Sequence, residues 1–411
     1  MKAHSMRLPF ATVVAAFVVL GPVAPLFAAD AGNADTAAKA RATLDKAIQY
    51  LKAQQKDNGG WGTEKDPPAL TALVLKAIVV GRPQDKQEGY VRKGYQNLLS
   101  NQLANGGIYR DLLANYNTAI AVSALAAADD PQYRDRIDRA VAYLKGLQLT
   151  DQTRPEYSGP KEQFTGKQFI KDDKDPFYGG WGYGGARSQG VGRPDLSNVQ
   201  VTLDALHDAG LKPGDPAYDR AVKFVTRLQN LSETNDQPWA GDDGGFVYSP
   251  ADTRRGDSMA GEYTGPDGRR MLRSYGSMTY AGLKSMIYAG LTKDDPRVKA
   301  AWDWIRKNWS VDENPGMRLN NADAARNGLY YYYHTMARAL NAYDEPTVVD
   351  AQGKKHDWRA ELVDKLASLQ RPDGSFAGEK RFMEDNPVLV TAYTAIALAE
   401  TLQDLKEHPP R

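Results

Sequence analysis

The stretch that decides the fold is Tyr50-Leu51-Lys52-Ala53-Gln54-Gln55-Lys56-Asp57-Asn58-Gly59-Gly60-Trp61, which reads aromatic-Leu-x3-Gln-x3-Gly-x-Trp. It predicts a helix over about 36–55, because Ala, Leu and Ile recur there at helical spacing, and then a polar turn that closes on Gly-Gly-aromatic. An almost wholly apolar helix is predicted next, over 68–80, with Gly81 as its stop. The unit is therefore a helix, a glycine turn and a second helix.

Weaker copies of this unit recur along the chain. The first helix of each copy ends near Gln55, Gln102, Gln148, Gln229, Trp309 and Gln370. The second helices are predicted over 68–80, 116–127, 197–209, 274–289, 328–342 and 387–402. A core unit of about 45 residues explains the spacing if two turns carry insertions, at 150–177 and 249–270. We expect one domain over 32–411.

The two helices of each unit differ in character. The first is amphipathic, which is typical of a half-exposed outer helix, and the second is apolar around most of its surface, which is typical of a buried one. We therefore predict an all-α fold, an α/α toroid of six helix pairs in inner and outer rings. An open solenoid is the alternative at this period, but the chain shows no polar capping repeats, which favours closure.

Composition and the N-terminus limit the function classes. The net charge of +1 gives no argument for a nucleic-acid partner, and the absence of Cys excludes thiolate nucleophiles and Cys-ligated metals. Lys2 and Arg7, an apolar run over 10–20 and the small residues around Ala29-Asp30-Ala31 predict a signal peptide at 1–31, and hence export to the periplasm or outside the cell. A retained membrane anchor is the alternative, although the run is short for a span. No later stretch of the sequence is long and apolar enough to cross a bilayer.

The repeated units, alternating with apolar helices over about 36–402, resemble those of squalene and hopene cyclases and of protein prenyltransferase β-subunits. Those families are α/α toroids. The chain also resembles secreted bacterial proteins described only as prenyltransferase/squalene-oxidase-repeat proteins. The resemblance implies one toroid domain with an extended ligand in an aromatic-lined cavity.

The chemistry of those families does not carry over. Hopene cyclases protonate an alkene with the middle Asp of a D-x-D-D-T-A motif, and the matching stretch here is Asp195-Leu196-Ser197-Asn198, in which Ser197 replaces the acid. Asp195 also suits a helix N-cap. Prenyltransferases bind zinc through Asp, Cys and His, but this chain has no Cys and no His pair at ligand spacing. We expect no metal and no cofactor.

Polar and aromatic residues gather where the apolar helices are predicted to begin, and in a toroid those beginnings meet at one end. Tyr330-Tyr331-Tyr332-Tyr333-His334 opens the fifth, where we expect Tyr330 and His334 on one face as acid or base, or simply as packing. Glu384 suits either a helix cap or an acid paired with Arg381. The candidate catalytic residues are Tyr330, His334, Arg193, Asp195 and Glu384, and the candidate ligand-binding residues are Trp181, Tyr183, Asn198, Tyr275, Tyr280 and Tyr331.

Three function classes remain open. The first is an isoprenoid enzyme or binder, which a deep apolar aromatic cavity would favour. The second is a carbohydrate-active enzyme, a polysaccharide lyase or hydrolase using Tyr, His and Arg, which an open groove with basic residues and paired carboxylates would favour. The third is a non-catalytic binding or scaffold protein, which a barrel filled by residues 330–333 would favour. We expect a hydrophobic or extended small molecule or a glycan as ligand, no nucleic acid, and a monomer.

Overall fold

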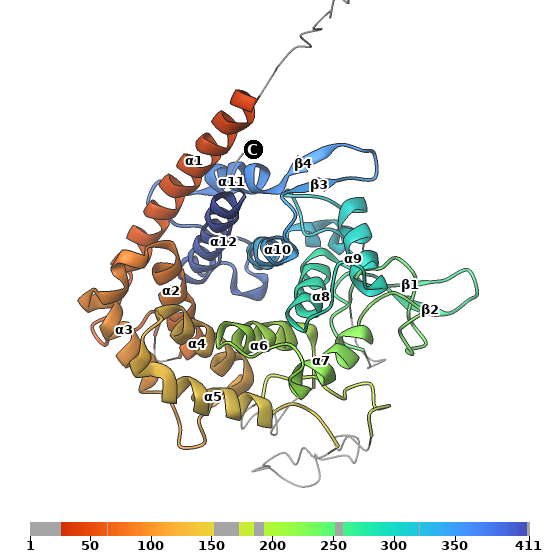
Figure 1. The fold of residues 1–411 in the computed structure, drawn as a ribbon, viewed down its shortest axis with the longest axis horizontal. Helices are drawn as coiled ribbons and strands as arrows, with labels where there is room; N and C mark the ends of the chain where they lie inside the picture. Colours follow the sequence, from red (N-terminus) through yellow and green to blue (C-terminus); the bar gives the residue numbers. More distant parts are fainter. Residues whose placement is uncertain are drawn as a thin grey trace, which may run out of the picture.

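A computed structural model describes residues 26–63, 65–151, 172–184, 193–250, 258–319 and 321–408. Most of the predicted signal peptide and most of the insertion at 150–177 lie outside these residues, as does 251–257 of the second insertion. Within the described residues, the helices form two concentric rings (Figure 1).

The inner ring consists of the second helix of each pair. It contains α2 (Pro68–Gly81), α4 (Ala114–Ala128), α6 (Leu196–Asp208), α8 (Gly276–Tyr288), α10 (Leu329–Tyr343) and α12 (Pro387–Glu407). Each inner helix contacts the next in this order, and α12 contacts α2, so the ring closes. The predicted α/α toroid is confirmed, and the open solenoid is excluded.

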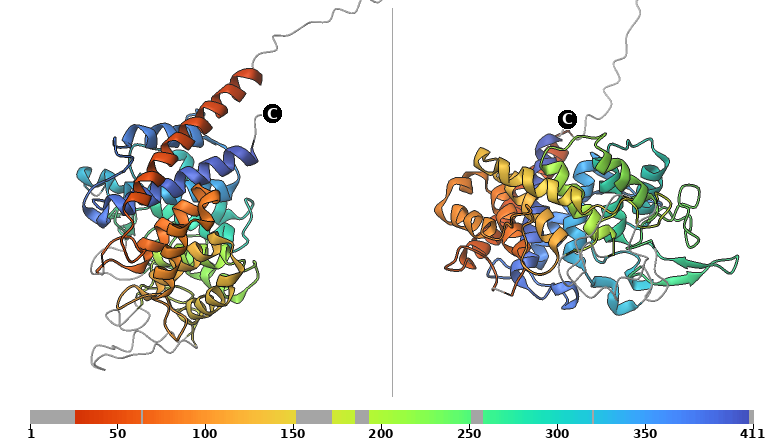
Figure 2. Two further views of the ribbon diagram at one scale, coloured as in Figure 1. Left: turned by 90° about the vertical axis from the view of Figure 1, so that its left-hand side faces the viewer. Right: turned by 90° about the horizontal axis from the view of Figure 1, so that it is seen from below.

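The outer ring consists of the first helices. It contains α1 (Leu26–Ala53), α3 (Gly89–Leu99), α5 (Arg134–Gly146), α7 (Pro216–Thr226), α9 (Pro296–Lys307) and α11 (Trp358–Leu369). Helix α1 begins at Leu26 rather than near Thr36, because the intervening segment is rich in alanine, the strongest helix former. It projects beyond the rings (Figures 1 and 2). The predicted cleavage positions therefore lie in the first turns of α1.

Short strands and 3-10 helices lie in the segments that connect the α-helices. Two antiparallel hairpins, which the sequence patterns did not predict, pair β1 (Glu262–Thr264) with β2 (Arg270–Leu272) and β3 (Thr347–Val349) with β4 (Lys355–Asp357). Among the described residues, the 3-10 helices are Pro83–Gln87, Pro131–Tyr133, Met317–Leu319, Ala322–Arg326 and Arg381–Met383. None of the described helices combines the length and apolarity that crossing a bilayer requires.

The repeated glutamine links neighbouring pairs. In five copies its Nε2 donates to the first glycine carbonyl of its own turn and to a carbonyl of the next outer helix, at 2.8–3.1 Å. The residues and their acceptors are Gln55 (Gly59, Tyr90), Gln102 (Gly106, Arg136), Gln148 (Gly179, Ala217), Gln229 (Gly244, Arg297) and Gln370 (Gly374, Thr43). Because Thr43 belongs to α1, Gln370 closes the outer ring.

The fifth copy keeps this link with different chemistry. Trp309 replaces Gln, and its indole Nε1 donates to Glu361 Oε2 of α11 at 2.8 Å. The other carboxylate oxygen of Glu361 lies 2.7 Å from His356 Nδ1. The copy is thus degenerate in sequence but still tied to the next outer helix.

Candidate functional site

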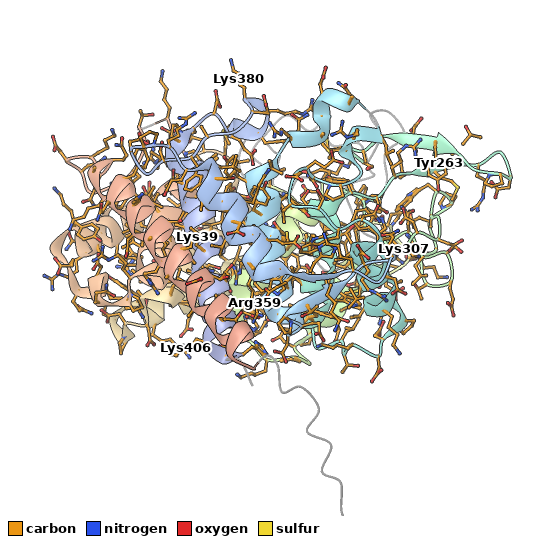
Figure 3. The ribbon with its side chains drawn as sticks, turned by 90° about the horizontal axis from the view of Figure 1, so that it is seen from above. Lys39, Tyr263, Lys307, Arg359, Lys380 and Lys406 are labelled. Atoms are coloured by element: carbon orange, nitrogen blue, oxygen red, sulfur yellow. The ribbon has the colours of Figure 1, made fainter. Side chains whose placement is uncertain are left out.

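One cavity of about 260 Å³ lies where the inner helices begin. All six contribute to its wall with residues of their first two turns, including Leu70, Tyr116, Ser197, Met278, Tyr331 and Leu389. Lys380 precedes α12 and Lys406 lies near its end, and Figure 3 shows these two residues at opposite edges of the toroid. The cavity therefore belongs to the Lys380 end.

The wall of this cavity is aromatic and apolar. Its tyrosines are Tyr116, Tyr183, Tyr248, Tyr275, Tyr331 and Tyr393, and its large apolar residues are Leu70, Leu73, Leu113, Met259, Met278, Met317, Phe382, Met383 and Leu389. Two carboxylic acids, Asp66 and Glu384, also line it. Among the described residues, no Lys, Arg or His does.

Hydroxyl groups bond to one another along the wall. Tyr331 OH lies 2.9 Å from Ser197 Oγ and accepts from Gln200 Nε2 at 2.6 Å. Tyr183 OH and Tyr248 OH lie 3.3 Å apart. Ser197, expected from the family resemblance at the position of the cyclase acid, is thus on the cavity wall but is bound to Tyr331.

Two buried carboxyls cap inner helices. Glu384 Oε1 accepts from the backbone N of Tyr330 and of Tyr331, both at 2.9 Å, and Oε2 has no hydrogen-bond partner among the described residues. Asp195, the N-cap of α6, accepts from the backbone N of Asn198 at 2.9 Å and from its Nδ2 at 2.8 Å. Burial raises the pKa of Glu384 to about 7 and that of Asp195 to about 6, although the hydrogen bonds oppose the shift.

Glu384 should make the free energy of unfolding fall as pH rises from about 4.5 to 7. Its pKa lies at about 7 in the folded chain and near its ordinary 4.5 in the unfolded chain, so the folded chain binds more protons in this window. Its contribution is complete below the unfolded pKa and is lost as pH rises through the folded pKa.

Glu384→Gln removes this titration. The unfolding free energy of the unmodified chain, relative to the variant, should drop by about 3 kcal/mol between pH 4 and pH 8. Urea denaturation of both proteins at both pH values measures the drop. A difference that stays constant with pH would show that the folded carboxyl titrates normally.

A cluster of paired charges closes the barrel below the cavity. It is formed by Lys76, Asp204, Asp208, Lys284, Arg338 and Glu400, from five of the six inner helices. Asp204 lies 2.8 Å from Lys284 Nζ and 3.0 Å from Arg338 Nη1, and Asp208 lies 2.6 Å from Lys76 Nζ. Each cation has an acidic partner.

His334 belongs to this lower region. It lines a separate cavity of about 20 Å³ together with Lys76, Asp204 and Arg338, and not the large cavity. Burial, with the positive charges of Lys284, Arg338 and Lys76, holds its pKa well below the ordinary value. His334 is therefore neutral, and its Nδ1 has no hydrogen-bond partner among the described residues.

The expected pairing of Tyr330 with His334 on one face is wrong. Tyr331 and His334 share the inward face, since both line the lower cavity. Tyr330 packs against the rings of Tyr333 and Phe376. Inward residues of α10 follow the spacing Tyr331, His334 and Arg338, which places Tyr330 one position off that face.

Of the other predicted site residues, Tyr183, Tyr275, Tyr331 and Glu384 line the large cavity. Arg193, Asp195, Trp181, Asn198 and Tyr280 line neither cavity. Trp181 is fully buried and donates to Leu144 O at 2.7 Å, Tyr280 packs edge-on against Tyr332, and Asn198 bonds to Asp195.

Two more expectations differ from the observed contacts. Arg193 is exposed and bonds to Ser249 Oγ at 3.1 Å. Arg381 does not pair with Glu384, because its guanidinium lies over the ring of Phe382, 5.3 Å from the centroid. Asp195 caps α6 as expected, whereas Glu384 caps α10 and not the helix that it precedes, α12, whose N-cap is Asn386.

The sequence patterns missed several residues of this region. Tyr116, Tyr248 and Tyr393 line the large cavity, and Asp204, Lys284 and Arg338 form the charge cluster. The sequence does contain a sign of the charge cluster, because Lys76, Lys284 and Arg338 interrupt helices that are otherwise apolar. A buried cation requires a buried partner.

No protein-family model matches the sequence, and no curated protein matches it. Solved structures do. The chain is similar to the type II terpene cyclase MstE from Scytonema in complex with its product merosterolic acid A, with a TM-score of 0.54, 15% identity and coverage of 90% of this chain and 99% of that one. The complex of MstE with its substrate geranylgeranyl dihydroxybenzoate gives a TM-score of 0.52 at the same identity and coverage.

A weaker likeness is to an α-1,6-mannanase of Salegentibacter, with a TM-score of 0.47, 10% identity and coverage of 88% of this chain and 98% of that one. At such identities only the fold is shared. The comparison with MstE thus agrees with the helix contacts: the chain is an α/α toroid, as terpene cyclases are.

Proposed function

We propose that this protein binds an extended, largely apolar molecule of the isoprenoid class in the large cavity. The wall of six tyrosines and nine large apolar residues is the observation that carries the proposal. An apolar cavity of about 150 Å³ takes a benzene ring. A volume of about 260 Å³ therefore suits a larger ligand.

The fold likeness supports this ligand class, since MstE in the same fold holds a geranylgeranyl-bearing substrate. We propose binding rather than cyclisation started by alkene protonation. Ser197 stands at the acid position, and a hydroxyl group cannot protonate an alkene. Aromatic faces that line a cavity suit an unsaturated chain through dispersion and π contacts.

The other two classes have less support. A carbohydrate-active site of the expected kind needs basic side chains and paired carboxylates at a groove, whereas no Lys, Arg or His is among the described residues of the wall. A filled barrel would leave no cavity, and Tyr332 and Tyr333 instead donate to Ser310 O and Val311 O, both at 2.7 Å. We also propose that the chain is exported and monomeric, which N-terminal sequencing and light scattering of the protein from its host would test.

The binding proposal predicts that an isoprenoid copurifies with the protein from its native host, which mass spectrometry of an organic extract would detect. Leu73→Trp adds bulk to the wall and should weaken farnesol binding by on the order of ten-fold or more. Leu103→Trp is the matched control, because Leu103 is 40% exposed and outside the cavity. Equal farnesol affinity in the two folded variants, checked by circular dichroism, would contradict the assignment of the cavity.

A further inference from the structure

The large cavity lies at the N-terminal ends of six inner helices. Such an end carries unpaired backbone N–H groups and a partial positive charge, and it readily binds phosphate or carboxylate. Six of them around one cavity would ordinarily suggest an anionic ligand. The contacts of these ends therefore bear on which form of an isoprenoid the cavity can take.

Each of the six ends is already bonded to an oxygen of the protein. The backbone donors and their acceptors are Ala69 to Asn117 Oδ1, Asn115 to Tyr183 O, Asn198 to Asp195 Oδ1, Ser277 to Asn314 Oδ1, Tyr330 to Glu384 Oε1 and Val388 to Asn386 Oδ1, at 2.9–3.0 Å. Two of the acceptors, those that cap α6 and α10, are carboxyl groups. At least one backbone donor at each end is thus already bonded and would have to be released before it could bind a phosphate.

The charged side chains near the cavity also disfavour an anionic ligand. The only ionisable side chains of the described wall, other than tyrosines, are Asp66 and Glu384, and both are acids. The cations below the cavity are paired with carboxylates, as Lys284 is with Asp204. Two arginines contact wall residues from outside the wall: Arg110 donates to Asp66 O at 3.3 Å, and Arg381 lies over the ring of Phe382. Both are exposed, so solvent and salt screen them.

Asn117, Tyr183, Asn314 and Glu384 each cap a helix from another segment of the chain, and Glu384 is the carboxyl group among them. It precedes α12 yet binds the first turn of α10, and its side chain is 1% exposed. Its carboxyl group therefore fills one helix end and adds an acid to the wall at the same time. No described cation lies within ion-pair distance of it.

We propose that the cavity selects the uncharged form of its isoprenoid ligand over the diphosphate or carboxylate form, and that Glu384 is a specificity-determining residue for this choice. The inference rests on the proposed function, since it concerns the same cavity. An anion at the α10 end must compete with the Glu384 carboxyl for the backbone N of Tyr330 and Tyr331. A neutral alcohol or hydrocarbon meets no such competition.

Farnesol and farnesyl diphosphate are the probes, titrated calorimetrically into the full chain at pH 8. Farnesol should bind tighter by on the order of ten-fold or more. Diphosphate binding that equals or exceeds farnesol binding would overturn the inference and leave the proposed function standing. If neither probe binds, the proposed function fails, and the inference fails with it.

Glu384→Ala exposes the two backbone N–H groups and removes the charge, so the affinity for diphosphate relative to farnesol should rise by about ten-fold. Glu384→Gln keeps a capping oxygen and should give a smaller rise. Glu379→Ala removes an exposed acid from the same connection and should leave the ratio unchanged. An unchanged ratio in both Glu384 variants would overturn the role of this residue, and the ratio for the unmodified chain decides the selectivity even if Glu384→Ala does not fold.

Discussion

Replacing Asp204 with alanine should lower the free energy of unfolding by about 3–5 kcal/mol, because it leaves the buried Lys284 without its acidic partner and removes one of the partners of Arg338. Asp204 lies within 3.0 Å of both Lys284 and Arg338, and the Lys284 side chain is fully buried. Burial already lowers the pKa of Lys284 to about 8 although Asp204 opposes this. Without Asp204, Lys284 must either stay charged in an apolar barrel or lose its proton.

Urea denaturation at pH 7 measures this loss, and Asp364→Ala is its control. Asp364 pairs with Lys39 at 2.5 Å, but both side chains are more than half exposed. A surface pair of this kind contributes about 1 kcal/mol or less. Equal losses in the two variants would mean that water reaches the Asp204 cluster.

The fold could be predicted from the sequence because its register signals are local. Each Gln lies at the end of an outer helix, and in three copies its first acceptor is four residues further on, as with Gln370 and Gly374. The second acceptor of Gln370, Thr43, is far away in the sequence, yet it follows from the repetition of one arrangement. The degenerate copy keeps a link to the next outer helix through Trp309.

The cavity was harder to predict, because it depends on helix rotation and on contacts between distant segments. Successive residues on a helix differ by about 100° in direction, so a run of four tyrosines does not itself tell which one faces inward. Tyr331 rather than Tyr330 does so. The cap that Glu384 provides to α10 joins positions more than fifty residues apart, which no local pattern encodes. Trp181 belongs to the repeat, as its burial and bond to Leu144 indicate.

Replacing Gly179 with alanine should lower the free energy of unfolding by about 4 kcal/mol, the combined cost of backbone strain and overpacking. Its φ is +86°, a region that side chains disfavour. A Cβ there would lie 1.9 Å from the backbone O of Arg220 in α7. That oxygen belongs to a helix backbone and cannot move aside without disturbing the link between the third and fourth pairs.

Gly146→Ala is the matched control for this prediction. Gly146 ends α5, its φ is not positive, and a Cβ would meet nothing within 4 Å. The same substitution there should stabilise the fold by about 0.5–1 kcal/mol, because alanine loses less backbone entropy in a helix. Thermal and urea denaturation of both variants measure the contrast. A Gly179→Ala variant as stable as the unmodified chain would contradict this prediction. The close approach of the glycine turn to α7 would then not be needed to hold the third and fourth pairs together, and the bonds of Gln148 alone would have to do so.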